Sequence, residues 1–239
     1  MKINLPFQFQ LKINKRYKSL KYLLPIGCDC HPAYMLSKLG LRNESLPFDW
    51  MDTKPALALN FAFETIQSEF YFFLNDLVKN EQGKVFAQKH PEALFYHFDD
   101  LIENIDFQKI IEERTQRLLK LYKNKACYFL HTVTSQAIEE ESDLHFVIQS
   151  LAKFSSLLKP NDELLIYLRF DESLTESSYH AQLLAKEIQS FSQVKMISYV
   201  RKKDKFGIWG DETQYKKLVD DIGIQTKIRF PKITLIREK

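Results

Sequence analysis

Apolar segments alternate with amphipathic segments along most of this chain, and this alternation restricts the fold more than any other feature. Short apolar runs are typical of strands buried on both faces, and runs with a 3.6-residue period predict helices. Strands separated by such helices favour an α/β fold with a mainly parallel sheet and helices on both faces. The expected order from Tyr22 is strand Tyr22–Ile26, helix Pro32–Leu39, helix Lys54–Leu77, strand Ala93–Phe98, helix Leu101–Tyr122, strand Ala126–Val133, helix Leu144–Leu158, strand Glu163–Phe170, helix His180–Phe191, strand Val194–Val200 and helix Gln214–Ile222.

The 239 residues contain no repeat and no Gly/Ser-rich linker, so we expect one α/β domain over residues 22–239. Residues 1–21 lack a clear period and are expected to form an N-terminal arm or an edge strand. Around Pro47 the segment Ser45–Trp50 is expected to be extended. Two aromatic-rich features follow: the PFDW segment that ends at Trp50, and the run Phe61–Phe73.

The charge is nearly balanced, with 34 basic and 31 acidic side chains and a net charge of +3. The basic clusters Lys12–Lys21 and Arg201–Lys205 are interpreted as solvated surface, so no nucleic-acid partner is expected. Three cysteines are too few for a disulfide framework and fit a reducing cytoplasm. We find no signal peptide and no apolar run of about 20 residues, so no membrane span is expected. Nothing in the sequence indicates the oligomeric state.

Two cysteines follow the first strand directly. Gly27 ends the apolar run, Cys28 and Cys30 flank Asp29, and an amphipathic segment begins at Pro32. A thiol at such a turn lies beside free backbone N–H groups and the positive end of a helix dipole, which favour the thiolate. Cys30 is therefore a candidate nucleophile. The alternative is that both cysteines are small, inert core residues.

Other polar residues are predicted to lie at the carboxyl ends of strands, where sites form in parallel sheets. His97 is the first candidate base for Cys30, with Asp99 or Asp100 to orient it, and His131 is the second. Asp171 ends a further strand.

Asp49 and Trp50 form another candidate pair, since a carboxylate beside aromatic side chains must be paired or bind something. The alternative for Asp49 is a turn residue bonded to its own backbone. The spacing of Cys28, Cys30 and a histidine does not match the common zinc patterns, so no metal is expected. Six glycines include no phosphate-binding loop, so we expect no nucleotide cofactor bound in that way.

The run IGCDCHPAYMLSKLGLRNESLPFDW resembles the opening signature of a bacterial family described as papain-like cysteine peptidases (domain of unknown function 1796). Weaker similarities are FYHFDD, IIEERTQRLLKLYKNKACYFLH and IWGDETQYKKL. The resemblance implies that Cys30 is the nucleophile, His97 the base and Asp99 its acidic neighbour. Phe98 intervenes where the family pattern leads us to expect adjacent His and Asp, and His131 stands where an arginine is expected.

These observations predict an enzyme that acts on an acyl bond through Cys30, as a hydrolase or as an acyltransferase. Backbone N–H groups around Asp29 to His31 would hold the oxyanion. The substrate is expected to be a small molecule, a peptide or a glycan, with Asp49, Trp50 and His131 in contact with it. A transferase would use a donor such as acyl-CoA, and analogy links it to cell-surface polysaccharide metabolism. The alternative is a non-catalytic module that binds a glycan or a protein in a groove formed by PFDW and Phe61–Phe73.

Overall fold

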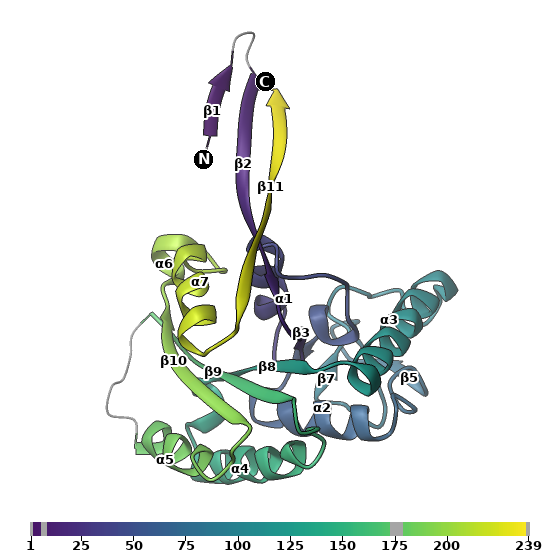
Figure 1. Cartoon of the computed structure of the whole chain (residues 1–239). Coiled ribbons are helices and arrows are strands. Elements are labelled where there is room, and N and C mark those ends of the chain that lie inside the picture. Colours follow the sequence, from purple (N-terminus) through teal and green to yellow (C-terminus); the bar gives the residue numbers. More distant parts are fainter. Residues whose placement is uncertain (1, 6–8, 173–178, 238–239) are drawn as a thin grey trace.

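A four-stranded parallel sheet forms the centre of the protein (Figure 1). The computed structural model describes residues 2–5, 9–172 and 179–237. The strand order in this sheet is β10-β9-β8-β3, and every pair is parallel. The sheet confirms four expected strands: β3 is Tyr22–Pro25, β8 is Cys127–Thr134, β9 is Glu163–Asp171 and β10 is Val194–Arg201.

Helices cover both faces of this sheet, as the alternation predicted. Successive residues of β8, such as Phe129 and Leu130, belong to two different buried clusters because neighbouring side chains of a strand point to opposite faces. The larger cluster lies against α2, α3, α4 and α5, and the smaller one against α1 and α7. The helices are α1 His31–Lys38, α2 Ala58–Gln67, α3 Ile105–Asn124, α4 Glu141–Ser155, α5 Tyr179–Ile188, α6 Lys203–Phe206 and α7 Glu212–Asp221.

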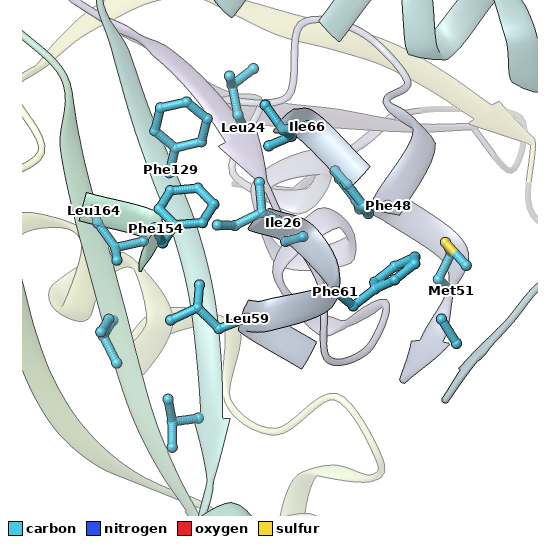
Figure 2. Close-up of a cluster of buried hydrophobic side chains, with 14 of the residues drawn as sticks. Leu24, Ile26, Phe48, Met51, Leu59, Phe61, Ile66, Phe129, Phe154 and Leu164 are labelled. Atoms are coloured by element: carbon cyan, nitrogen blue, oxygen red, sulfur yellow. The ribbon is translucent and has the colours of Figure 1, made fainter. Parts of the chain in front are cut away.

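The aromatic run Phe61–Phe73 does not form an open groove. Phe61 and Phe73 are 1% and 2% exposed, and both rings pack edge-on against Phe48 of the PFDW segment. Figure 2 shows Phe61 and Phe48 among the aliphatic side chains of the larger cluster. Rings of this size contribute most when they are buried, so the run serves as core. Tyr71 and Phe72 are the exposed members of the run.

Part of the sequence between α1 and α3 folds differently from the expectation. The PFDW segment is a 3-10 helix, Pro47–Trp50, instead of an extended piece. The expected strand Ala93–Phe98 contracts to the two-residue β7, Ala93–Leu94, which pairs antiparallel with β4, Asp52–Thr53. The expected helix Lys54–Leu77 is broken: α2 ends at Gln67, and Glu69 and Phe70 adopt positive φ values. A second small hairpin joins β5, Leu77–Lys79, to β6, Val85–Ala87.

A long antiparallel arm projects from the rest of the molecule (Figure 1). Its strand order is β1-β2-β11, with β1 Lys2–Leu5, β2 Phe9–Ser19 and β11 Thr226–Arg237. The sequence predicted an arm or edge strand at residues 1–21 but not its pairing with β11. Of the described strands, four lie in the parallel sheet and seven in antiparallel sheets, so the fold is a mixed α/β arrangement and not mainly parallel.

Candidate active site at the carboxyl end of the parallel sheet

The turn after β3 holds Cys28 and Cys30 in different backbone conformations. Gly27 has φ +113° and Cys28 has φ +70°, a left-handed conformation that is costly for a residue with a Cβ. The Thr53 amide of β4 donates to the Cys28 carbonyl at 2.8 Å and holds this strained residue in place. Cys30 then returns to the helical region as the N-cap of α1, and Pro32 occupies the first turn. The strand–turn–helix prediction is confirmed.

Burial separates the three thiols. Cys28 and Cys127 are 3% and 0% exposed, whereas Cys30 is partly exposed. Cys127 begins β8, so it lies at the amino end of the sheet, opposite the turn. Cys30 is thus the thiol that a molecule outside the protein reaches most easily.

Contrary to the sequence-based expectation, the Cys30 thiol is not acidified by its place at the start of a helix. Partial burial, and next the negative charge of Asp29, raise the pKa of Cys30 to about 11. The hydrogen bond from its own backbone N–H acts in the opposite direction but is weaker. The charge of Asp52 adds to the increase. Cys30 is therefore a neutral thiol at pH 7.

Asp29 is tied to the sheet by a buried arginine. The Asp29 carboxylate accepts hydrogen bonds from Arg169 Nη1 at 2.7 Å and from the His31 backbone N–H at 3.0 Å. Arg169 lies in β9 and is 5% exposed. Burial, the largest single cause, would raise the pKa of Asp29, but the interactions with Arg169 and His31 together outweigh it and lower that pKa. Because Asp29 occupies the His31 amide, that N–H is not free to hold an oxyanion.

The ion-pair network continues along the carboxyl ends of β9 and β10. Asp171 accepts from Arg201 Nε and Nη2 at 2.7 and 2.8 Å, and its carboxylate lies 3.6 Å from Arg169 Nε. Lys203 is 3.3 Å from the same carboxylate. Burial opposes ionisation of Asp171, but these cations lower its pKa. The predicted position of Asp171 at a strand end is confirmed.

Asp52 is a further carboxyl group of this neighbourhood. It lies in β4, directly before Thr53, whose amide binds the Cys28 carbonyl. Its pKa is raised, first by partial desolvation and then by the charge of Asp29. Asp52 is exposed to solvent.

The proposed His97–Asp99 pair is not assembled. His97 is exposed and its ring meets the edges of Trp50 and Tyr96, with centroids 5.6 and 5.3 Å away. Asp99 instead forms an ion pair with Lys84 at 2.8 Å. Among the described residues, no imidazole is hydrogen-bonded to the Cys30 sulfur. His97 is connected to the turn through neighbouring strands. Leu94 of β7 is paired with Asp52 of β4, and the next residue, Thr53, binds the Cys28 carbonyl.

Two residues expected to touch substrate are buried. His131 is 1% exposed in the central strand β8, and desolvation lowers its pKa to about 4, so its ring is neutral at pH 7. Asp49 is 1% exposed, accepts from the Leu46 amide at 2.7 Å and is bonded to Arg42. Neither side chain has an exposed surface that a ligand could contact, so both residues contribute to the packing of the protein interior. Trp50 remains partly exposed, with Arg42 over its ring at 5.7 Å.

The side chain of His31 anchors the start of α1 to the segment around Trp209. Its Nε2 is 2.8 Å from the Trp209 carbonyl oxygen, and its ring packs edge-on against Tyr215, 5.5 Å between centroids. Burial lowers the pKa of His31 to about 4. The ring is therefore neutral at pH 7. Its Nδ1 atom is buried and has no hydrogen-bond partner among the described residues.

Sequence reasoning did not single out Arg169 or Asp52, and it interpreted Arg201 as part of a solvated cluster, whereas its guanidinium is paired with Asp171. One signal for Arg169 was present, because an arginine inside the apolar run ELLIYLRF must find a buried counter-charge. Asp52 had no such signal, since its importance depends on the pairing of β4 beside the turn. Among the described residues, no cluster of histidine, cysteine and carboxylate side chains is arranged to bind a metal ion.

The turn presents a partly exposed thiol at the carboxyl end of a parallel strand, which is the edge at which sites form in open parallel sheets. Residues 21–169 match the family model whose description reads "Putative papain-like cysteine peptidase (DUF1796)". The chain belongs to this family, and the match includes Cys30, Asp52, His97 and Arg169. Searches of curated proteins and of solved structures returned no match. The helices in the described part of the chain are all too short or too polar to span a membrane.

Proposed function

We propose that the protein hydrolyses an acyl bond, of the amide or ester type, with Cys30 as the nucleophile. The observation that carries this proposal is that Cys30 combines partial exposure with a position at the N-terminus of α1, after a strained turn. Membership of a family described as cysteine peptidases supports the same chemistry.

In this mechanism the thiol loses its proton during attack and not before it. The Cys30 sulfur forms a bond to the acyl carbon while its proton passes to a base. Collapse of the tetrahedral intermediate breaks the bond to the leaving amine or alcohol, which takes up that proton. Water then attacks the thioester, releases the carboxylic acid and restores the thiol. A general base is required because a thiol with a pKa near 11 is almost fully protonated at pH 7.

The backbone amides of Asp29 and Cys30 are the proposed oxyanion donors. Neither amide donates a hydrogen bond to another described residue, whereas the His31 amide is bonded to Asp29. Donors fixed in a turn cost little reorganisation when charge develops on the carbonyl oxygen. Arg169 has a positioning role here, because its bond to Asp29 fixes the turn that carries both amides.

Two groups compete for the role of base. His97 is the family-based choice and lies beside Trp50 on an exposed segment. Asp52 is the alternative, because its carboxyl group acts electrostatically on the Cys30 thiol and is open to solvent. Removal of a general base commonly lowers turnover about 10²- to 10⁴-fold.

Hydrolysis and acyl transfer share the thioester intermediate and differ in what attacks it. Attack by water makes the protein a hydrolase, and attack by a sugar hydroxyl makes it an acyltransferase with acyl-CoA as the donor. An acyltransferase of this kind would act in the bacterial cytoplasm, in the metabolism of cell-surface polysaccharide. The family description favours hydrolysis of a peptide-like bond. The competing non-catalytic function, binding of a glycan or a protein in an aromatic groove, loses support because Phe61, Phe70 and Phe73 of the run are buried in the core.

An activated ester tests the proposal without knowledge of the natural substrate. With p-nitrophenyl acetate, the protein should release p-nitrophenolate and form a Cys30 thioester visible in the intact mass. Cys30→Ala should abolish both signals, while Cys127→Ala, the matched control at the other end of the sheet, should keep them. Equal release by Cys30→Ala and the parent, both folded by circular dichroism, would overturn the proposal. An adduct with acyl-CoA that passes to a sugar would assign transfer.

The two candidate bases are separated by a second pair of variants. His97→Gln and Asp52→Asn each remove one proton acceptor and keep a similar shape. The variant that lacks the true base should acylate about 10²-fold or more slowly than the parent, and the other variant should be slower by less than about tenfold. An unchanged rate in both variants would exclude both residues.

A further inference from the structure

One face of the arm carries apolar side chains along all three strands. The register β1–β2–β11 pairs Ile3 with Leu11 and Leu11 with Leu235, so these residues share a face. Ile13 pairs with Ile233, and Tyr17 with Ile228, on the same face, because alternate residues of β2 point to the same side and a register shift between Arg229 and Lys232 returns Ile228 to it.

This apolar face is open over most of its length. Ile228, Ile233 and Leu235 are 80%, 61% and 56% exposed, and Ile3 of β1 is 38% exposed. At the base of the arm, Tyr17 is covered by Lys216 of α7, whose Nζ lies 4.5 Å from the ring centroid. A sheet with one apolar face normally buries it against a second layer. The described part of the chain supplies that layer only at the base.

The opposite face of the arm is basic. Lys18 lies directly opposite Lys227, and Arg16 opposite Arg229. None of these four forms an ion pair with a described residue. The described strands of the arm hold nine lysine or arginine residues and no acidic residue. Like charges placed opposite each other repel, so this face requires solvent or an anionic partner.

We propose that the apolar face of the arm packs against the same face of a second copy of this chain. The packing is self-complementary: two three-stranded sheets form a small sandwich about a two-fold axis, and both basic faces remain in water. A membrane surface fits less well, since Arg16, Lys18, Lys227 and Arg229 lie on the face opposite to the one that would enter the lipid. Acidic protein or nucleic acid would cover the basic face and leave the apolar one exposed.

The size of the face sets the expected strength of the dimer. Two strands about 4.8 Å apart over some 30 Å, with the four residues of β1 beside one end, give a patch that buries on the order of 700 Å² in total for the pair. This area is in the range of weak, transient interfaces. We therefore expect a concentration-dependent dimer with a dissociation constant in the micromolar range, about 1–100 μM.

Sedimentation velocity from about 1 to 200 μM tests the proposal on the full chain, at concentrations that bracket this range. The parent should shift from monomer to dimer, and Ile233→Lys with Leu235→Lys should stay monomeric at the highest concentration. Both positions are more than half exposed, so these changes should leave the thermal unfolding temperature nearly unaltered. The control Lys18→Gln with Lys227→Gln alters the basic face and should dimerise as the parent does.

Three outcomes would overturn the proposal: a parent that is monomeric throughout, a dimer that survives both lysine substitutions, or a dimer lost only in the basic-face control. The first outcome combined with binding to phosphatidylglycerol vesicles would assign the arm to a membrane surface instead. The proposal is independent of the thiol chemistry, because Cys30→Ala should dimerise like the parent.

Discussion

The carboxyl end of the parallel sheet and the arm are both rich in lysine and arginine, but the cations are paired with carboxylates in the first region and unpaired in the described part of the second. At the sheet end, Arg169 and Arg201 each bind a carboxylate that comes from another part of the chain. On the arm, Arg16 faces Arg229 across a strand pair, and neither forms an ion pair with a described residue. Paired charges fix a precise local geometry, whereas unpaired ones keep a surface solvated. The first region is built as a site and the second as an exposed surface.

Breaking the buried pair at the sheet end should give the largest effect. Arg169→Met removes the cation and leaves Asp29 with a partly buried, uncompensated charge. We expect the free energy of unfolding, measured in urea, to fall by about 3 kcal/mol, the lower end of the range for a broken buried pair, because the Asp29 side chain keeps 24% of its surface exposed. The control Lys203→Met acts on a half-exposed pair and should cost less than about 1 kcal/mol. A similar loss of unfolding free energy in both variants would contradict the idea that the buried pair stabilises the fold more than the half-exposed one.

The ion pair between Arg169 and Asp29 should also make the stability of the protein depend on pH. The pKa of Asp29 is lower in the folded protein than in the unfolded chain, so its contribution is present above the ordinary value of about 4. It is lost as pH falls through the folded pKa. The stability advantage of the parent over Asp29→Asn should therefore be full at pH 7 and shrink in acid, in unfolding curves recorded from pH 7 down to pH 3. A constant difference would mean that the Asp29 charge contributes nothing.

A third effect, on rates, tests the electrostatics around the thiol. With a pKa near 11, Cys30 should react with iodoacetamide about tenfold faster for each pH unit between 7 and 10. Asp52→Asn removes a negative charge and should increase the rate at pH 8, by about tenfold for each unit by which the pKa falls. Peptide-resolved mass spectrometry gives Cys127 as an internal control, because Asp162, not Asp52, is the carboxylate that raises its pKa. A Cys30 rate that levels off below pH 8 would show a preformed thiolate.

The smallest effect is expected on the arm. Lys18→Glu replaces a like-charge pair with Lys227 by an opposite-charge pair, and should stabilise the protein by about 0.2–1 kcal/mol. The gain should diminish in 1 M salt, where the screening length falls to about 3 Å. A destabilised variant would indicate that the basic face already has an anionic partner.

Much of the central sheet was predictable from the sequence. The strands β8, β9 and β10 and the helix α3 lie close to their expected ranges, since each has a strong local period. The short strand β7 and the 3-10 helix at Pro47–Trp50 were not predicted correctly, because a few residues without a period take their conformation from their neighbours. The identity of the thiol turn was predicted, and the state of its sulfur was not.

The local sequence alone determined that Gly27, Cys28 and Cys30 form a turn between a strand and a helix, because apolar runs, a glycine and Pro32 act within a few residues. Tertiary structure alone decided that Arg169 meets Asp29, 140 residues away, and that β11 completes the arm with β2. It also decided the largest cause of the raised pKa of Cys30, since desolvation depends on what surrounds the sulfur, whereas the charge of its chain neighbour Asp29 comes second.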